Sequence, residues 1–285
     1  MFGRNEGEIK QVRSWQAHNA GDIALISARS PYSFISGHAH DLFADGRSNL
    51  VSCYKKASHA DSQAMSYLRQ RKRCFLSDPE WKTIPWLQHE KNPRDYLFDT
   101  ILDLAGSFED LDSMKSRIDP YERELSRQLV LDGFLQLHQE LITWELLHAP
   151  DFEPFSSVPD SLLAHHIAGA HLMTSFWATV LIVSSNIKAL IRPGEEFDPI
   201  FDLDLCCANM IRTFPIFVHP SLGLFRTHVT TYPFTVAVHY ICAVGPRRLV
   251  EERRILADCL YNPALAGVRQ FMSNMKEERP EEFLN

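Results

Sequence analysis

The chain has 285 residues, of which 45% are hydrophobic, and its 29 Lys and Arg against 36 Asp and Glu give a formal net charge of −7 at pH 7. A chain of this size buries enough apolar surface to hold a core, so the disordered and disulfide-scaffold classes are excluded. The acidic balance argues against nucleic-acid binding through net charge. The opening stretch MFGRNEGEIKQVRSW lacks the apolar run of a signal peptide, and we expect an intracellular protein.

Glycine is scarce, at 12 of 285 residues, which favours long helices over many turns. The first clear helical pattern runs from Asp95 to Ile118, between two expected helix breakers, Pro93 and Pro120. Its apolar residues recur in steps of three or four, which predicts one buried face. That face comprises Leu97, Ile101, Leu104, Phe108, Leu111, Met114 and Ile118.

Three further helices are predicted over Tyr121–His148, Leu172–Leu190 and Asp202–Phe214. The stretch Leu172–Ile191 is also the best candidate for a membrane span, but its serines, threonines, asparagine and lysine favour a buried amphipathic helix. We therefore expect no membrane association. The apolar stripe predicted for the first of these helices comprises Leu125, Leu129, Phe134, Leu137, Leu141, Trp144 and Leu147.

The stretch Leu222–Val244 is nearly uncharged and rich in aromatic and β-branched residues, which would also suit a strand. A buried helix is favoured, because its neighbours are helical and would leave a strand without partners. Arg247–Leu260 is predicted to be an exposed charged helix. The expected fold is an all-α, multi-helix bundle or array formed by residues 1–275, with a subdivision considered at the linker 151–160 and a polar tail at 276–285.

Residues that could carry chemistry are numerous but poorly spaced. The densest of the 13 histidines are His38 with His40, and His165 and His166 with His171. None has the spacing that stacks two metal ligands on one helical face, and the pattern Ser185-x-x-Lys188 lacks the partner motifs of serine-nucleophile enzymes. We expect no metal, no other cofactor and no enzymatic activity.

One basic cluster stands apart from the acidic background: Arg69, Arg71, Lys72 and Arg73, reinforced by Lys55 and Lys56. Such a run could be a nuclear-import signal or a phosphate-contacting patch. The alternative, a solvated helix end before the turn Ser77-Asp78-Pro79, is favoured because a few basic residues do not reverse the net charge.

Four segments carry a family resemblance in their order and spacing. Together they resemble the C-terminal regulatory region of fungal binuclear zinc-cluster transcription factors. The segments are the helix Trp15–Gly21, the basic stretch and Trp-Pro turn of Arg71–Trp86, the helix starting at His171–Trp177 and, more loosely, the segment from Phe214 to Arg248. The resemblance spans nearly the whole chain. It implies an all-helical module that modulates transcription, often of secondary-metabolite gene clusters, and it implies no catalysis.

The family's DNA-reading element is a six-cysteine zinc cluster with two C-x-x-C pairs. This chain also has six cysteines, but they form no C-x-x-C pair and are interpreted as core residues: Cys53, Cys74, Cys206, Cys207, Cys242 and Cys259. Direct nucleic-acid binding is therefore not carried over from the resemblance. The chain is expected to be a regulator without its own DNA-binding domain, or a truncated, non-functional fragment of a zinc-cluster factor.

The leading hypothesis is a nuclear protein, with the cytoplasm as the alternative location, that contacts the transcription machinery or a DNA-binding factor. The alternative is a helical module that senses an effector small molecule, since ligand pockets are mostly apolar with a few polar groups. Plain core packing is favoured over a pocket for the residues concerned, which are Trp177, Phe225, Tyr232, Phe234 and Tyr240.

Overall fold

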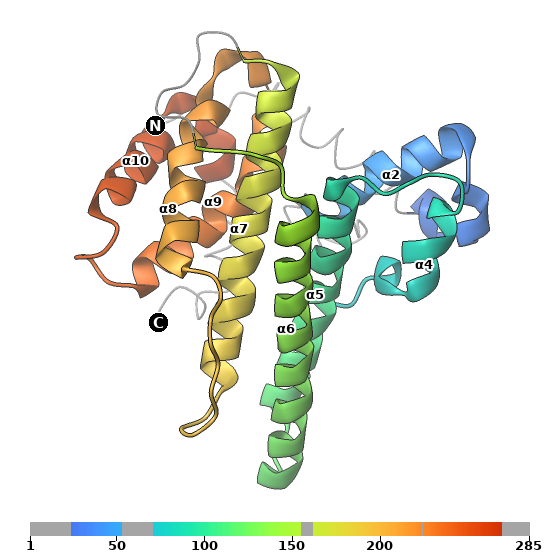
Figure 1. Ribbon diagram of the computed structural model, residues 1–285, viewed down its shortest axis with the longest axis vertical. Coiled ribbons are helices and arrows are strands. Elements are labelled where there is room, and N and C mark those ends of the chain that lie inside the picture. Colours follow the sequence, from blue (N-terminus) through green and yellow to red (C-terminus); the bar gives the residue numbers. More distant parts are fainter. Residues whose placement is uncertain (1–23, 53–70, 155–161, 224, 270–285) are drawn as a thin grey trace, which may run out of the picture. The chain divides into compact units, whose positions relative to one another are not determined.

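The computed structural model describes residues 24–52, 71–154, 162–223 and 225–269 (Figure 1). All regular secondary structure within these ranges is helical, so the protein is all-α, as predicted. The chain divides into two compact units, Met1–Arg123 and Glu124–Asn285. The boundary falls inside one long helix, α6 (Pro120–His148). Of the linker 151–160, residues 155–160 lie outside the described ranges.

The first unit contains short helical turns that precede one long helix, α5, which begins at Pro93 and ends at Ser116. Pro93 is the first residue of α5 rather than a breaker ahead of it, because proline lacks an N–H that a helix start does not use. Asn92 and Asp95 form a reciprocal capping box, each side chain accepting the other's backbone N–H at 3.1 Å. The elements before α5 are η1 (Pro31–Phe34), α2 (Gly37–Ser52), η2 (Phe75–Ser77), α4 (Pro79–Thr83) and η3 (Ile84–Trp86).

The predicted apolar face of α5 is confirmed for six of its seven residues. These six, the first being Leu97 and the last Met114, are all buried. The seventh, Ile118, lies beyond the end of the helix and is 91% exposed. A cluster of aromatic rings forms the rest of this core, with Phe34, Phe43 and Trp81 at centroid distances of 5.4 to 5.8 Å from one another.

The second unit is organised around α7 (Ala164–Leu190), which packs against both α8 (Leu203–Thr213) and α9 (Phe225–Ala243), as Figure 1 shows. The helix α7 begins eight residues before the predicted start at Leu172. The remaining elements of this unit are η4 (Phe214–Val218), η5 (Pro220–Leu222), α10 (Val250–Tyr261) and η6 (Pro263–Leu265).

The helix α7 is the one described helix that is long and apolar enough to cross a membrane by length and composition. Its polar residues therefore do not exclude a span, contrary to the expectation from the sequence. The prediction of a buried helix agrees with the packing, because 67% of its most apolar window lies inside the protein. Two of its buried hydroxyls bond to its own backbone, Thr174 to the carbonyl of Ala170 at 2.7 Å and Thr179 to that of Ser175 at 2.8 Å, whereas the buried Ser184 hydroxyl has no partner.

The stretch predicted as a helix over Leu222–Val244 is α9, and the strand alternative is excluded. On α9, Val229 and Pro233 are buried, whereas Val236 and Tyr240 are only partly buried. The residues that reach the core most fully are Val229, Thr230, Phe234, Ala237 and Ile241. Pro233 lies inside the helix, and its neighbour Phe234 stacks on Phe214 with ring centroids 3.7 Å apart.

The apolar stripe of α6 is buried only in its middle. Phe134, Leu137, Leu141 and Trp144 belong to the core, and Trp144 stacks on Phe176 of α7 at 4.8 Å. The predicted stripe residues at the two ends are exposed instead: Leu125, Leu129 and Leu147.

Candidate functional site

The basic cluster singled out in the sequence lies against the acidic face of α5. Arg71 makes a bidentate ion pair with Asp112, with two N–O distances of 2.7 Å. Lys72 Nζ lies 2.8 Å from Glu109, and Arg73 Nη2 lies 2.8 Å from Asp110. Arg69 lies outside the described residues, as do Lys55 and Lys56. We call the contact of residues 71–73 with residues 109, 110 and 112 the charge zipper.

Three further features hold the charge zipper in place. The Arg71 guanidinium lies 4.2 Å from the centre of the Phe108 ring, a cation–π contact. Glu109 accepts the backbone N–H of Arg73 at 2.9 Å. The pKa of the Glu109 carboxyl is lowered, mainly by its hydrogen bond with Lys72 and next by this bond from Arg73. A Cβ on Gly106 would lie 2.8 Å from the Arg73 guanidinium, so glycine leaves room for that side chain on the helix surface.

The backbone of the basic cluster turns at Arg71. Arg71 has a φ of +55°, in the left-handed region that non-glycine residues seldom occupy. A solvated helix end, as interpreted from the sequence, includes neither this turn nor the ion pairs. They were missed because the acidic partners lie 36 to 41 residues away in the chain.

The aromatic residues proposed as a ligand pocket point to different neighbours. Trp177 is buried and lies 6.2 Å from the Phe152 ring. Phe234 packs face to face on Phe214. The side chain of Phe225 lies outside what the structure describes. Trp177 and Phe234 therefore have different ring neighbours.

The two tyrosines of the same set are each hydrogen-bonded. The Tyr232 hydroxyl lies 3.0 Å from Thr179 Oγ1 on α7, and burial raises the pKa of this tyrosine. The Tyr240 hydroxyl donates to Asp204 of α8 at 2.9 Å, and Arg248 also pairs with that carboxylate. Burial is the main cause that raises the pKa of Tyr240, followed by its bond to Asp204. These hydroxyl groups join helices within the second unit.

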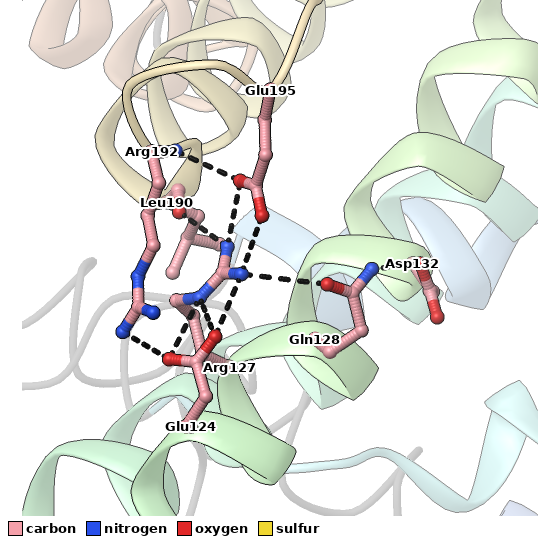
Figure 2. Close-up of polar contacts among 7 residues, drawn as sticks. All are labelled: Glu124, Arg127, Gln128, Asp132, Leu190, Arg192 and Glu195. Carbon is pink, nitrogen blue, oxygen red and sulfur yellow. Dashed lines mark hydrogen bonds and ion pairs between the residues drawn. The ribbon is translucent and has the colours of Figure 1, made fainter.

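Arg127 of α6 holds a cluster of polar contacts in the described part of the second unit (Figure 2). Its guanidinium contacts Glu124 at 2.9 Å and Glu195 at 2.6 Å, and it donates to the carbonyl oxygen of Leu190 at 2.8 Å. Arg192 pairs with the same Glu124. The bonds to Arg127 are the main cause that lowers the pKa of both glutamates. The spacing of Glu124 and Arg127 could have been noticed in the sequence, but Glu195 could not.

A second buried charge, Arg47, was also missed by sequence reasoning. It is 1% exposed, pairs with Asp99, and lies 5.4 Å from the centre of the Trp86 ring. Lys91 shares the Asp99 carboxylate, so two cations use one anion within the first unit. Two nitrogens of Arg47 and the indole nitrogen of Trp86 are buried without a hydrogen-bond partner.

The histidines do not assemble a metal centre in the part of the chain that the structure describes, where no group of three metal-ligating side chains is found. His40 stacks on His89 at 3.9 Å and its Nδ1 lies 3.1 Å from the Phe34 carbonyl, while His38 is fully exposed beside Asp41. His165 and His166 contact each other edge to face.

The cysteines agree with the core interpretation in four of the five described cases, and Cys242 is the exception because it is exposed. Burial is the main cause that raises the pKa of the other four thiols to about 12. Thiols with so high a pKa are poor nucleophiles at neutral pH. The buried residues are Cys74, Cys206, Cys207 and Cys259.

Comparisons of the chain with protein-family models, with characterised proteins and with solved structures give no significant match.

Proposed function

We propose that this chain is a regulator of transcription that acts through contacts with other proteins, either the transcription machinery or a DNA-binding factor. Control of secondary-metabolite genes and residence in the nucleus belong to the same proposal, and both come from the resemblance of the four sequence segments to the fungal regulatory region. The all-α fold is consistent with that resemblance.

The observation that carries the protein-contact part of the proposal is a pair of leucines on α6. Leu125 and Leu129 are 59% and 66% exposed, and their spacing of four residues places them side by side on one face of the helix. Two adjacent leucines in water form an exposed apolar surface that a protein partner can cover. The same helix exposes Leu146 and Leu147 near its C-terminal end.

The proposal is tested by deleting the gene and measuring transcripts genome-wide. The expected result is loss of a defined set of transcripts, which the wild-type gene restores and the variant Leu125→Asp/Leu129→Asp does not. The matched control is Ile200→Asp/Leu205→Asp, which changes two aliphatic side chains that are also exposed, and it is expected to restore the transcripts. Unchanged expression after deletion contradicts the proposal.

A small-molecule sensor is the alternative proposal. It has less support, because the described aromatic residues proposed for its pocket each bond or stack with a different neighbour. Thermal unfolding of the full chain against a panel of aromatic metabolites tests it. A ligand that binds the folded state raises the midpoint in a concentration-dependent way, and the absence of any shift rejects the sensor.

A further inference from the structure

The basic cluster is the sequence feature that suggests a nuclear-import signal. In the charge zipper, its described cations pair with carboxylates of the same chain. Each of the three described cations takes a different carboxylate: Arg71 takes Asp112, Lys72 takes Glu109 and Arg73 takes Asp110. One-to-one pairing of this kind neutralises the three cations within the molecule. A receptor that recognises a basic segment through its own carboxylates must compete with α5 for the same cations.

The backbone of the segment is held as well as its side chains. The N–H of Arg73 donates to Glu109, and the left-handed conformation of Arg71 turns the chain within the cluster. A receptor groove that binds a short segment in extended form needs free backbone groups and an extended φ at each position. The cluster therefore cannot enter such a groove without leaving α5.

The groups of α5 that bind the basic segment indicate which kind of partner could replace them. On α5 the basic segment is bound by carboxylates and by the face of an aromatic ring, Phe108. A protein groove that presents acidic side chains and aromatic rings offers the same contacts. Nucleic acid offers phosphates instead, and the net charge of −7 opposes its approach to this chain.

We propose that the acidic face of α5, formed by Glu109, Asp110 and Asp112, is an intramolecular mask for residues Arg71–Arg73 of the basic cluster. A nuclear-import receptor then binds these residues only when the charge zipper is open. The mask is electrostatic, and two of its three cations lie at the surface, since Lys72 and Arg73 are more than half exposed and Arg71 is 16% exposed. The pairs of Lys72 and Arg73 can therefore open without unfolding the core. This inference rests on the nuclear location in the proposed function and adds a means of regulating it.

The direct test is the affinity of the purified full-length chain for the purified import adaptor that binds short basic segments, measured at physiological salt. The open variant is Glu109→Ala/Asp110→Ala/Asp112→Ala, in which alanine preserves the helix. The charge-matched control is Asp41→Ala/Asp45→Ala/Asp258→Ala, which removes three exposed carboxylates that pair with His38, Arg94 and Arg254, none of them a residue of the charge zipper. The open variant is expected to bind at least about tenfold more tightly than the wild type, and the control to bind like the wild type.

Three additional measurements keep the result interpretable. Adding Lys72→Ala and Arg73→Ala to the open variant is expected to abolish binding, which shows that the basic cluster itself is recognised. Hydrogen exchange at the Arg73 amide is expected to be slow in the wild type and fast in the open variant, because Glu109 no longer accepts that N–H. Circular dichroism of the open variant is expected to match the wild type, since the replaced side chains lie on the helix surface.

Equal affinity of the wild type and the open variant overturns the mask, and so does an absence of binding by every form. Selective binding to phosphate-rich nucleic acid by the open variant, without binding to the adaptor, overturns the choice of partner. These outcomes do not depend on transcription. A protein that shows the mask but fails the transcript test keeps the inference about its basic cluster and loses the proposed function.

Discussion

Arg127 of α6 donates a hydrogen bond of 2.8 Å to the carbonyl oxygen of Leu190, the last residue of α7, across a separation of 63 residues in the chain. The last carbonyls of a helix have no partner within the helix, so this bond satisfies one of them with a charged donor. Two glutamates hold the same guanidinium, one from α6 and one from the turn after α7 (Figure 2). Arg127 thus fixes the C-terminal end of α7 against α6.

Replacing Arg127 with methionine is expected to lower the free energy of unfolding by about 1–3 kcal/mol, because the buried Leu190 carbonyl loses its donor. The control is Arg192→Met, which removes a more exposed arginine of the same network and is expected to have a much smaller effect. Urea unfolding followed by circular dichroism measures both. Equal losses in the two variants would show that the carbonyl bond is not the main contribution.

The imidazole of His138 is expected to make the second unit sensitive to acid. Its ring is buried between Phe197 and Phe201, and burial lowers its pKa. The folded state then binds the proton less tightly than the unfolded state, so this contribution to stability is present above the ordinary histidine pKa of about 6.5 and is lost as the pH falls below it.

The variant His138→Phe is expected to flatten that dependence, with a smaller loss of thermal midpoint between pH 7 and pH 5 than in the wild type. Phenylalanine keeps the aromatic contacts and removes a buried nitrogen that has no partner. His38→Gln, at a fully exposed position, is the control and is expected to follow the wild-type curve. Parallel curves for all three proteins would exclude His138 as the source.

Alkylation is expected to separate the described cysteines into two groups. Cys242 is exposed, whereas burial raises the pKa of Cys74, Cys206, Cys207 and Cys259. The thiolate is the reactive form, so the four buried thiols are expected to react on the order of 100-fold more slowly than Cys242 with iodoacetamide. Peptide mass spectrometry over a time course measures each rate. Denaturant is expected to remove the difference, and fast labelling of a buried thiol in the folded protein would contradict its burial.

The stacked pair Phe214 and Phe234 is expected to dominate the packing of α9. Both side chains have no exposed surface, and their ring centroids lie 3.7 Å apart. Phe234→Ala is expected to lower the free energy of unfolding by about 3–5 kcal/mol, through lost burial and the cavity left behind. Tyr261→Ala removes an aromatic ring that is 84% exposed, and it is expected to leave stability nearly unchanged. Chemical unfolding of the two variants side by side provides the measurement.

Local patterns in the chain were sufficient to predict most of the helices. The steps of three and four residues from Leu97 to Met114 predicted the buried face of α5 correctly, because a helix with one apolar side has few other ways to bury it. The same reasoning failed for Leu125 and Leu129 on α6, which are exposed. Periodicity shows which residues share a face, but not whether another element covers that face.

The candidate sites depended more heavily on tertiary structure. The basic cluster was visible as a run of charges, whereas its acidic partners on α5 could not be assigned from a sequence in which carboxylates are common. Arg47 and Glu195 gave no local signal, since their contacts join segments that are distant in the chain.

The all-α class and the long helices could be predicted from the order of residues alone, because these features depend on backbone preferences and on spacing within a few residues. The exact helix starts could not, since Pro93 is the first residue of α5 and α7 starts eight residues before the predicted start. Only the tertiary structure shows which charges pair and which apolar faces remain exposed to water. Arg71 pairs with Asp112, and Arg127 with the end of α7, because folding brings distant segments together and each buried or half-buried charge then requires a partner.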